Sequence, residues 1–96
     1  MRVMAKITIP VESGNQAVKD GSIGKTMQSA VERWKPEAVY SGSMEGKRAT
    51  WMVFDLPDPS DIVPFAEPFF MELNADVVVI PVMAPDDLQK GLAKLG

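Results

Sequence analysis

The chain begins with an alternating pattern that predicts a β-strand. Between Arg2 and Ile9 every odd position is apolar, whereas the even positions are mixed. The apolar set is Val3, Ala5, Ile7 and Ile9, and the even set is Arg2, Met4, Lys6 and Thr8. A period of two places the two sets on opposite faces of a strand. Pro10 ends the strand because it has no amide proton to donate to a β-ladder.

A helical period follows. Apolar residues recur at the i, i+4, i+7, i+8 and i+11 spacing of one helix face. They are Ile23, Met27, Ala30, Val31 and Trp34. Glycines interrupt the preceding stretch, and glycine is unfavourable inside a helix. We therefore expect a short helix over 16–20, a bend near Gly21 and Ser22, and a main helix that ends near Lys35, before Pro36.

The stretch 37–56 predicts a β-hairpin with Glu45 and Gly46 as a two-residue turn. One face then carries the pairs Gly42–Ala49, Tyr40–Trp51 and Ala38–Val53, and the other carries Ser43–Arg48, Ser41–Thr50 and Val39–Met52. We expect the mixed polar face to lie beside Met4 and Lys6. The sequence favours a core position for Tyr40 and Trp51, and leaves a position in a ligand cleft open.

The second half of the chain predicts a helix, a strand and a last helix. An apolar stripe is formed by Ile62, Phe65, Ala66, Phe69, Phe70 and Leu73. Pro68 should kink or split this helix, and Asn74 suits its C-terminal cap. The run 75–83 predicts a strand with apolar side chains on both faces, and Pro81 requires an edge position or a bulge. Pro85 opens a helix whose apolar face is Leu88, Leu92 and Leu95.

This order of elements predicts an α+β fold with a ferredoxin-like βαββαβ arrangement in one domain, residues 1–96. The expected sheet has four antiparallel strands in the order 4-1-3-2. The helices cover one face, and a short helix follows at the C-terminus. The other face, which we call open, must be wet or covered by a partner.

Composition restricts the partners. A chain of 96 residues has a thin core, and 46% of its residues are hydrophobic, so we expect a second copy of the chain to cover the open face. The net charge of −3 and the scattered basic residues argue against nucleic acid. No apolar run reaches about 18 residues, so we expect no membrane span. The N-terminal stretch reads as a strand, not a signal peptide, and we expect a cytoplasmic protein.

The sequence contains neither cysteine nor histidine. This excludes disulfides, thiolate nucleophiles and imidazole bases. No carboxylates lie at a spacing that suggests metal binding or paired acid–base work. We expect no metal and no cofactor. Any chemistry would use carboxylates, Lys, Tyr, Arg or backbone amides.

Six residues are candidates for ligand binding: Lys6, Tyr40, Arg48, Thr50, Trp51 and Met52. A lysine within a strand is either a solvated or paired charge or a cation that holds an anionic ligand. The Tyr40–Trp51 pair is either core packing or the wall of a cavity. The stretch Gly21–Thr26 ends like a phosphate-binding loop, but Lys19 stands where the motif needs its first glycine, so we interpret it as a helix bend.

Several features together resemble a known group. The element order, the start MRVM, the third strand GKRATWMVFD, and PVM before an acidic helix start are similar to the dimeric α+β barrel superfamily of ferredoxin-like proteins. Within it, the chain resembles a family of small uncharacterised bacterial proteins. The resemblance implies a homodimer that pairs sheet to sheet, with a cavity either between the sheet and the helices or at the interface of the two sheets.

The superfamily includes cofactor-independent monooxygenases, muconolactone isomerases, haem proteins similar to chlorite dismutase, YCII-like proteins and stress-responsive proteins. This chain has no histidine to bind haem or to form the His–Asp pair of the YCII-like proteins. No catalytic residue of the superfamily can therefore be carried over to it.

Three functions remain open from the sequence. The first is a homodimer that binds a small molecule in a cavity at the sheet. The second is a cofactor-independent monooxygenase or isomerase whose cavity uses Lys6, Tyr40, Thr50 or Arg48. The third is a structural or interaction module without a ligand.

Overall fold

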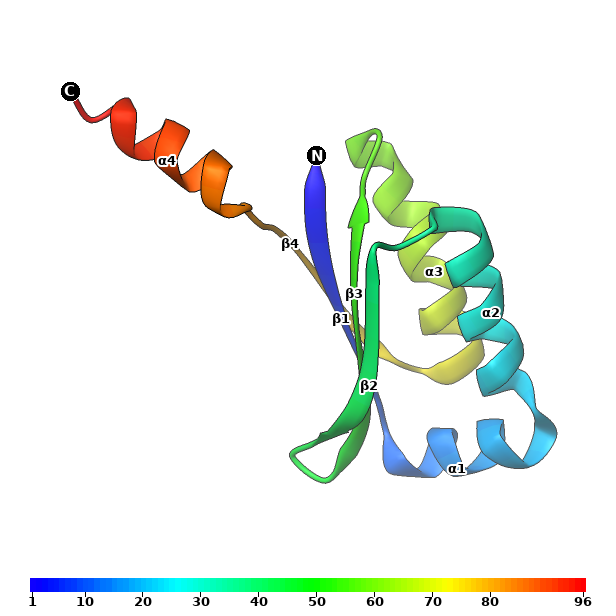
Figure 1. The fold of residues 1–96 in the computed structure, drawn as a ribbon. Coiled ribbons are helices and arrows are strands. Elements are labelled where there is room, and N and C mark those ends of the chain that lie inside the picture. Colours follow the sequence, from blue (N-terminus) through cyan, green and yellow to red (C-terminus); the bar gives the residue numbers. More distant parts are fainter.

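A computed structural model describes residues 1–96 and shows a sheet with helices on one face (Figure 1). Along the chain the elements are β1 Arg2–Ile9, α1 Val11–Asp20, α2 Ser22–Trp34, β2 Ala38–Met44, β3 Lys47–Asp55, the 3₁₀ turn η1 Pro59–Asp61, α3 Ile62–Leu73, β4 Asp76–Pro81 and α4 Pro85–Ala93. The strands are antiparallel and lie in the order β2-β3-β1-β4. The predicted α+β class and strand order are confirmed, and the fold is compatible with a ferredoxin-like arrangement.

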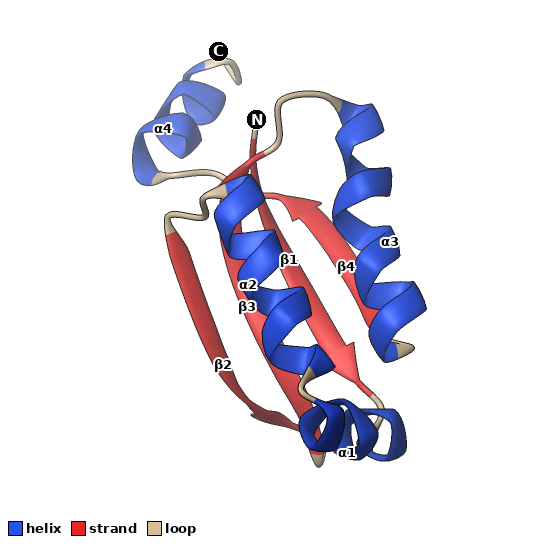
Figure 2. Ribbon diagram, turned by 90° about the vertical axis from the view of Figure 1, so that its right-hand side faces the viewer, coloured by secondary structure: helices blue, strands red, loops and turns tan.

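Helices α2 and α3 lie side by side across the sheet, and α1 lies at one end of it (Figure 2). The apolar set of β1 faces these helices, and Val3, Ala5, Ile7 and Ile9 are all 0–1% exposed. Their neighbours on β3 are Phe54, Met52, Thr50 and Arg48. The hairpin residues with even numbers on β3 therefore belong to the face that the helices cover.

This register corrects the predicted position of the hairpin. The expectation that Arg48, Thr50 and Met52 lie beside Met4 and Lys6 is wrong, because Lys6 pairs with Trp51 instead. The pairs within the hairpin itself are all confirmed. Alternation along β3 could not decide which set faces the helices, because both sets contain large apolar residues. The pairing of β3 with β1 decides it.

An aromatic cluster joins the helices to the sheet. The rings of Phe54 and Phe65 are stacked with centroids 4.6 Å apart. Trp34 packs against both, at 5.8 Å and 5.9 Å, and Phe69 extends the cluster along α3. Offset and tilted aromatic contacts of this kind add to the free energy gained from burial. Phe54, Phe65 and Phe69 are among the largest fully buried side chains of the protein.

Most turns and helix ends lie where the sequence predicts them. Glu45 and Gly46 both have positive φ, 54° and 77°, as a two-residue hairpin turn requires. Gly21 has φ 80° and separates α1 from α2 at the predicted bend. Asn74 ends α3 in the left-handed conformation, as expected.

Two helices differ from the prediction. Helix α1 starts at Val11, because the carbonyl of Pro10 already accepts a hydrogen bond of 2.8 Å from the amide of Gly14. Pro68 does not split α3, which runs unbroken through it. A proline removes one helical hydrogen bond, and the buried side chains on both sides of Pro68, including Phe65 and Phe69, hold the helix against the sheet.

The C-terminal part leaves the body of the molecule. Strand β4 lies at the edge of the sheet, where Pro81 is tolerated as predicted. Helix α4 then projects from the end of β4 and has no buried residue (Figure 1). None of the helices combines the length and the apolar character needed to cross a membrane.

The aromatic cluster gives the first prediction. Replacing Phe65, which is 1% exposed, by alanine should lower the free energy of unfolding by about 3–5 kcal/mol, because it leaves a cavity between α3 and the sheet. Phe70 lies on the same helix but is 41% exposed, so Phe70→Ala should cost about 1 kcal/mol or less. Urea unfolding followed by circular dichroism measures both. Equal losses would contradict this description of the core.

Asp58, which caps the 3₁₀ turn η1 before α3, gives a prediction about how stability depends on pH. Asp58 accepts hydrogen bonds from the hydroxyl and the amide of Ser60, and these lower the pKa of Asp58. The lowered pKa means that the capping contribution is present above the ordinary aspartate pKa of about 3.9 and is lost as the pH falls through the folded value. Asp58→Ala should lower the urea midpoint at pH 7, and the difference from wild type should shrink below about pH 4. A difference independent of pH would exclude this role.

Candidate functional site

The open face of the sheet is the first candidate site. Its central row is Tyr40, Trp51, Lys6 and Val78, because Trp51 pairs with both Tyr40 and Lys6, and Lys6 pairs with Val78. The structure therefore places the aromatic pair on the open face and not in the core, contrary to the position that the sequence favoured. The same register places Lys6 in the middle of the sheet.

The rows on either side follow from the same pairings. One consists of Ala38, Val53, Met4 and Ile80, and the other of Gly42, Ala49, Thr8 and Asp76. The first of these rows is entirely apolar. The centre of the open face is thus an apolar surface around Lys6, with Asp76 at one corner and the Arg2–Asp55 pair in the row at the other end.

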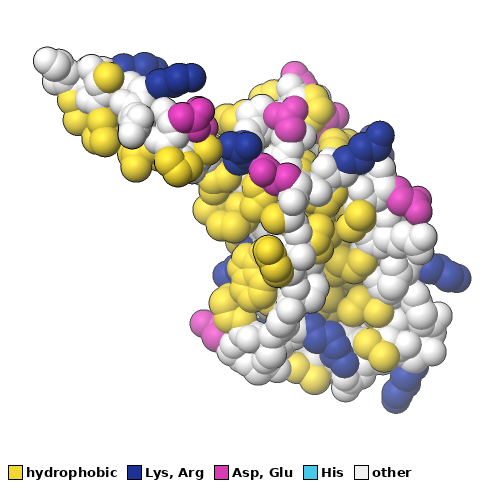
Figure 3. Space-filling view, viewed as in Figure 1, with side chains coloured by type: hydrophobic (Ala, Val, Ile, Leu, Met, Phe, Trp, Pro, Cys, Tyr) yellow, Lys and Arg dark blue, Asp and Glu magenta, His cyan; other side chains and the backbone are white.

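Large apolar side chains on this face are exposed. Tyr40 is 73% exposed, Val78 47% and Ile80 45%, whereas Lys6 and Trp51 are half-buried. Figure 3 shows hydrophobic side chains gathered over the sheet below α4. Neighbouring apolar side chains that remain exposed together are typical of a surface that binds a partner or a ligand.

A small cavity of about 170 Å³ lies at the centre of this face. It is lined by Met4, Lys6, Trp51, Val78 and Ile80. The lysine supplies a positive charge and hydrogen-bond donors, and the indole supplies a flat apolar wall. This combination suits an anionic group attached to an apolar or aromatic body.

Lys6 makes no ion pair in the structure. The two ion pairs present join the N-terminal amine to Asp55, at 2.8 Å, and Arg2 to Glu37, at 2.5 Å. An ammonium group that is half-buried among apolar side chains tolerates further loss of water only when an anion compensates its charge. Anything that covers the open face must therefore leave Lys6 hydrated or provide a negative charge.

The structure divides the predicted binding residues into two groups. Lys6, Tyr40 and Trp51 come together on the open face. Arg48, Thr50 and Met52 do not join them, since all three point to the helical side of the sheet. Any ligand contact of the second group would have to be made from that side.

Each residue of the second group has a partner within the fold. Met52 is fully buried, and the hydroxyls of Thr50 and Ser41 are hydrogen-bonded to each other at 2.9 Å. The guanidinium of Arg48 donates to the side-chain oxygen of Asn15 at 3.2 Å, which ties the hairpin to α1. These contacts give all three side chains a role in the packing and hydrogen bonding of the fold.

Sequence reasoning did not select Val78 and Ile80. The run 75–83 shows no alternation of apolar and polar residues, and only the β1–β4 pairing places Val78 and Ile80 on the face of Lys6. The apolar character of both faces of this strand was the available signal. It indicated that β4 presents apolar side chains to the open face as well as to the helices.

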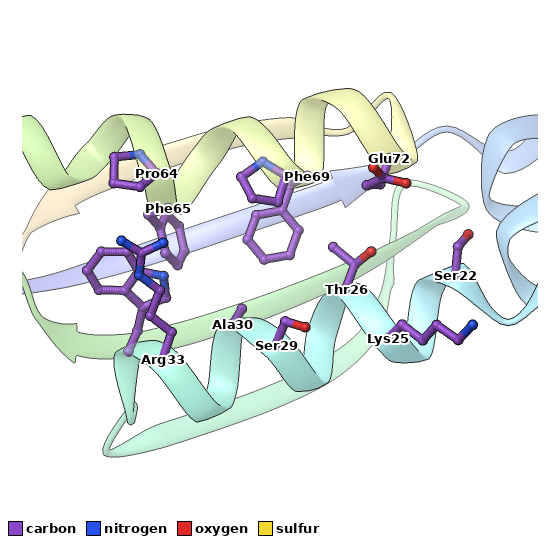
Figure 4. A pocket seen from close by; sticks show the side chains of 12 residues that line it. Ser22, Lys25, Thr26, Ser29, Ala30, Arg33, Pro64, Phe65, Phe69 and Glu72 are labelled. Atoms are coloured by element: carbon purple, nitrogen blue, oxygen red, sulfur yellow. The ribbon is translucent and has the colours of Figure 1, made fainter.

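A second concavity of about 410 Å³ lies between α2 and α3 (Figure 4). Phe65 and Phe69 form its floor, and Lys25, Arg33 and Glu72 stand at its rim. The Arg33 guanidinium lies 4.9 Å from the centre of the Trp34 ring. All three rim charges are exposed, so water and salt weaken any hold that they have on a ligand. The open face, with its half-buried cation, is the better candidate.

The fold and the site define a small α+β protein whose four-stranded antiparallel sheet exposes an apolar face with a central lysine. No protein-family model matches the sequence, and no curated protein matches it either.

Proposed function

We propose that the protein is a homodimer of the dimeric α+β barrel superfamily that binds a small anionic molecule between the open faces of two copies. The observation that carries this proposal is the position of Lys6, a half-buried and unpaired cation at the centre of an exposed apolar sheet face. Covering the apolar surface with a second layer removes it from water, and an anion within that layer compensates the charge of Lys6.

A second copy of the chain fits this surface. Two twisted sheets stack face to face at about 10 Å, and a twofold axis places the same patch on both sides of the interface. Tyr40, Val78 and Ile80, exposed in the single chain, become interface residues. The rim of the face carries charge, with Asp76 at one corner and Arg2 and Glu37 at the other end. An apolar centre with a polar rim is typical of protein interfaces.

A ligand follows from the symmetry of such a dimer. Because Lys6 lies near the middle of the face, the two Lys6 side chains of a dimer approach the twofold axis together. Two like charges in a space of low polarity repel each other and lose hydration. A bound anion removes both costs. A carboxylate, sulfonate or phosphate group between the lysines, with its apolar part against Trp51, satisfies the site.

The enzymatic alternative finds less support. A cofactor-independent monooxygenase or isomerase that used Lys6, Tyr40, Thr50 and Arg48 would need these side chains around one cavity. The register puts Thr50 and Arg48 on the opposite side of the sheet from Lys6 and Tyr40. We therefore propose binding and assign no reaction. A module without a ligand is the outcome expected if no anion binds.

The binding proposal is tested with Lys6→Met, which keeps the aliphatic stem and removes the charge. The anionic aromatic dye 1-anilinonaphthalene-8-sulfonate serves as the probe, and fluorescence titration measures its dissociation constant. We expect Lys6→Met to weaken dye binding at least tenfold. Its unfolding free energy should stay within about 0.5 kcal/mol of wild type, because Lys6 makes no ion pair in the single chain.

The matched control is Lys25→Met at the rim of the α2–α3 groove. It removes the same charge from the second concavity and should leave dye binding unchanged within about twofold. Loss of dye binding in Lys25→Met, with none in Lys6→Met, would place the ligand in the groove and contradict the proposal. Unchanged binding in both variants would show that neither lysine holds the anion and would also contradict the proposal.

A further inference from the structure

Helix α4 is an amphipathic helix with nothing to pack against in the single chain. Leu88, Leu92 and Leu95 are 48%, 56% and 83% exposed, and α4 has no buried residue. Leu88 and Leu92 share one face of α4, and Leu95 continues the i, i+4, i+7 spacing two residues beyond the last helical residue, Ala93. Asp86 and Lys90 point the opposite way on a helical wheel. A helix of nine residues is marginal in water unless its apolar face is covered.

The segment that connects α4 to the sheet is short and restrained. The amide of Val82 donates to the carbonyl of Arg2 at 3.1 Å, so pairing with β1 continues one residue beyond Pro81. At the other side, the amide of Ala84 donates to the carboxylate of Asp87 at 3.2 Å, which fixes the start of the helix. Prolines at 81 and 85 restrict the backbone at both ends. These contacts restrict the directions in which α4 can leave the end of β4.

The angle between β4 and α4 encloses an apolar hollow of about 450 Å³. It is lined by Pro81, Val82, Met83, Ala84, Pro85 and Leu88. Figure 1 shows that α4 projects to the side of the sheet opposite α2 and α3, which is the side of the open face. In Figure 3 the hydrophobic side chains on the lower side of α4 continue into those over the sheet.

We propose that α4 is an arm that clasps the second copy of the chain, whose body sits in the angle between α4 and the open face. The proposal rests on the homodimer proposed above and adds α4 to its interface. In a twofold dimer both chains donate an arm, so the contact is made twice and the assembly closes. The occupant is a second copy because the leucine face of α4 is continuous with the surface that the second copy covers.

The chain's own helices do not offer an equivalent site. They lie on the other side of the sheet (Figure 1). The free connection between the last paired residue, Val82, and Pro85 consists of Met83 and Ala84. Three residue steps span at most about 11 Å, whereas a helix outside α2 and α3 would lie roughly two layer spacings, about 20 Å, from the sheet. Covering its own helices would require the end of β4 to detach.

Hydrogen exchange on the full chain tests the arm directly. At concentrations below the dimer dissociation constant, the amides of 86–95 should exchange at rates close to those of an unstructured peptide. At a concentration about a hundredfold above that constant, where fewer than about a tenth of the chains are monomeric, they should exchange at least tenfold more slowly, in parallel with the fraction of dimer. Protection that is already complete in the monomer would show that α4 folds onto its own chain. Fast exchange in the dimer would show a free arm. Either result overturns the proposal.

A matched pair of substitutions gives the energetic test. Leu92→Glu places a charge on the apolar face of α4, and Ala93→Glu adds the same charge at the next position, away from that face. Leu92→Glu should raise the dimer dissociation constant at least tenfold in sedimentation experiments, and Ala93→Glu by less than about twofold. Neither should shift the unfolding midpoint of the monomer, since α4 buries no side chain there. Equal effects of the two substitutions on dimerisation would contradict the proposal that α4 contacts the second copy through its leucine face.

A third variant separates this proposal from the homodimer on which it rests. Trp51→Glu alters the centre of the open face without touching α4. If Trp51→Glu dissociates the dimer and Leu92→Glu does not, the sheet interface stands and the arm is wrong. If the wild-type chain is a monomer throughout, the homodimer and the arm fail together.

Discussion

The antiparallel pairing of β1 with β3 decides on which face of the sheet the candidate binding residues lie. It sets Ile7 against Thr50 and Lys6 against Trp51. A shift of one residue would exchange the two faces of β3 and turn Trp51 toward the helices. The aromatic cluster holds this register, because Phe54 on β3 must meet Phe65 and Trp34 beneath α2 and α3. The core therefore determines the open face indirectly: because alternate residues of β1 and β3 are buried under the helices, the residues between them face the other way.

The elements themselves could be predicted from the sequence because their signals are local. Alternation in β1, the helical spacing before Trp34 and the Glu45–Gly46 turn each need only neighbouring residues. The pairs within the hairpin follow from the turn alone, and all of them are found. The strand order follows from the restricted ways in which such elements connect.

Which face of the hairpin packs against the helices could not be predicted from the sequence, for a physical reason. Met52 and Phe54 on one side of β3 and Trp51 and Val53 on the other are equally able to fill a core. The choice is made by contacts between strands far apart in the chain, and these leave no local pattern. For the same reason Lys6, Tyr40 and Trp51 could be named as candidates but not joined into one site. The expected position of Arg48, Thr50 and Met52 beside Lys6 is wrong for this reason too.

In the dimer that we propose, a second copy of the chain completes three features of the single chain: the open face, Lys6 and α4. The exposed apolar row needs a cover, the unpaired lysine needs an anion, and the leucines of α4 need a surface. Molar mass from light scattering, at micromolar concentrations, tests this account most directly. It predicts a mass twice the 10.5 kDa of the chain, and a persistent mass of 10.5 kDa would contradict it.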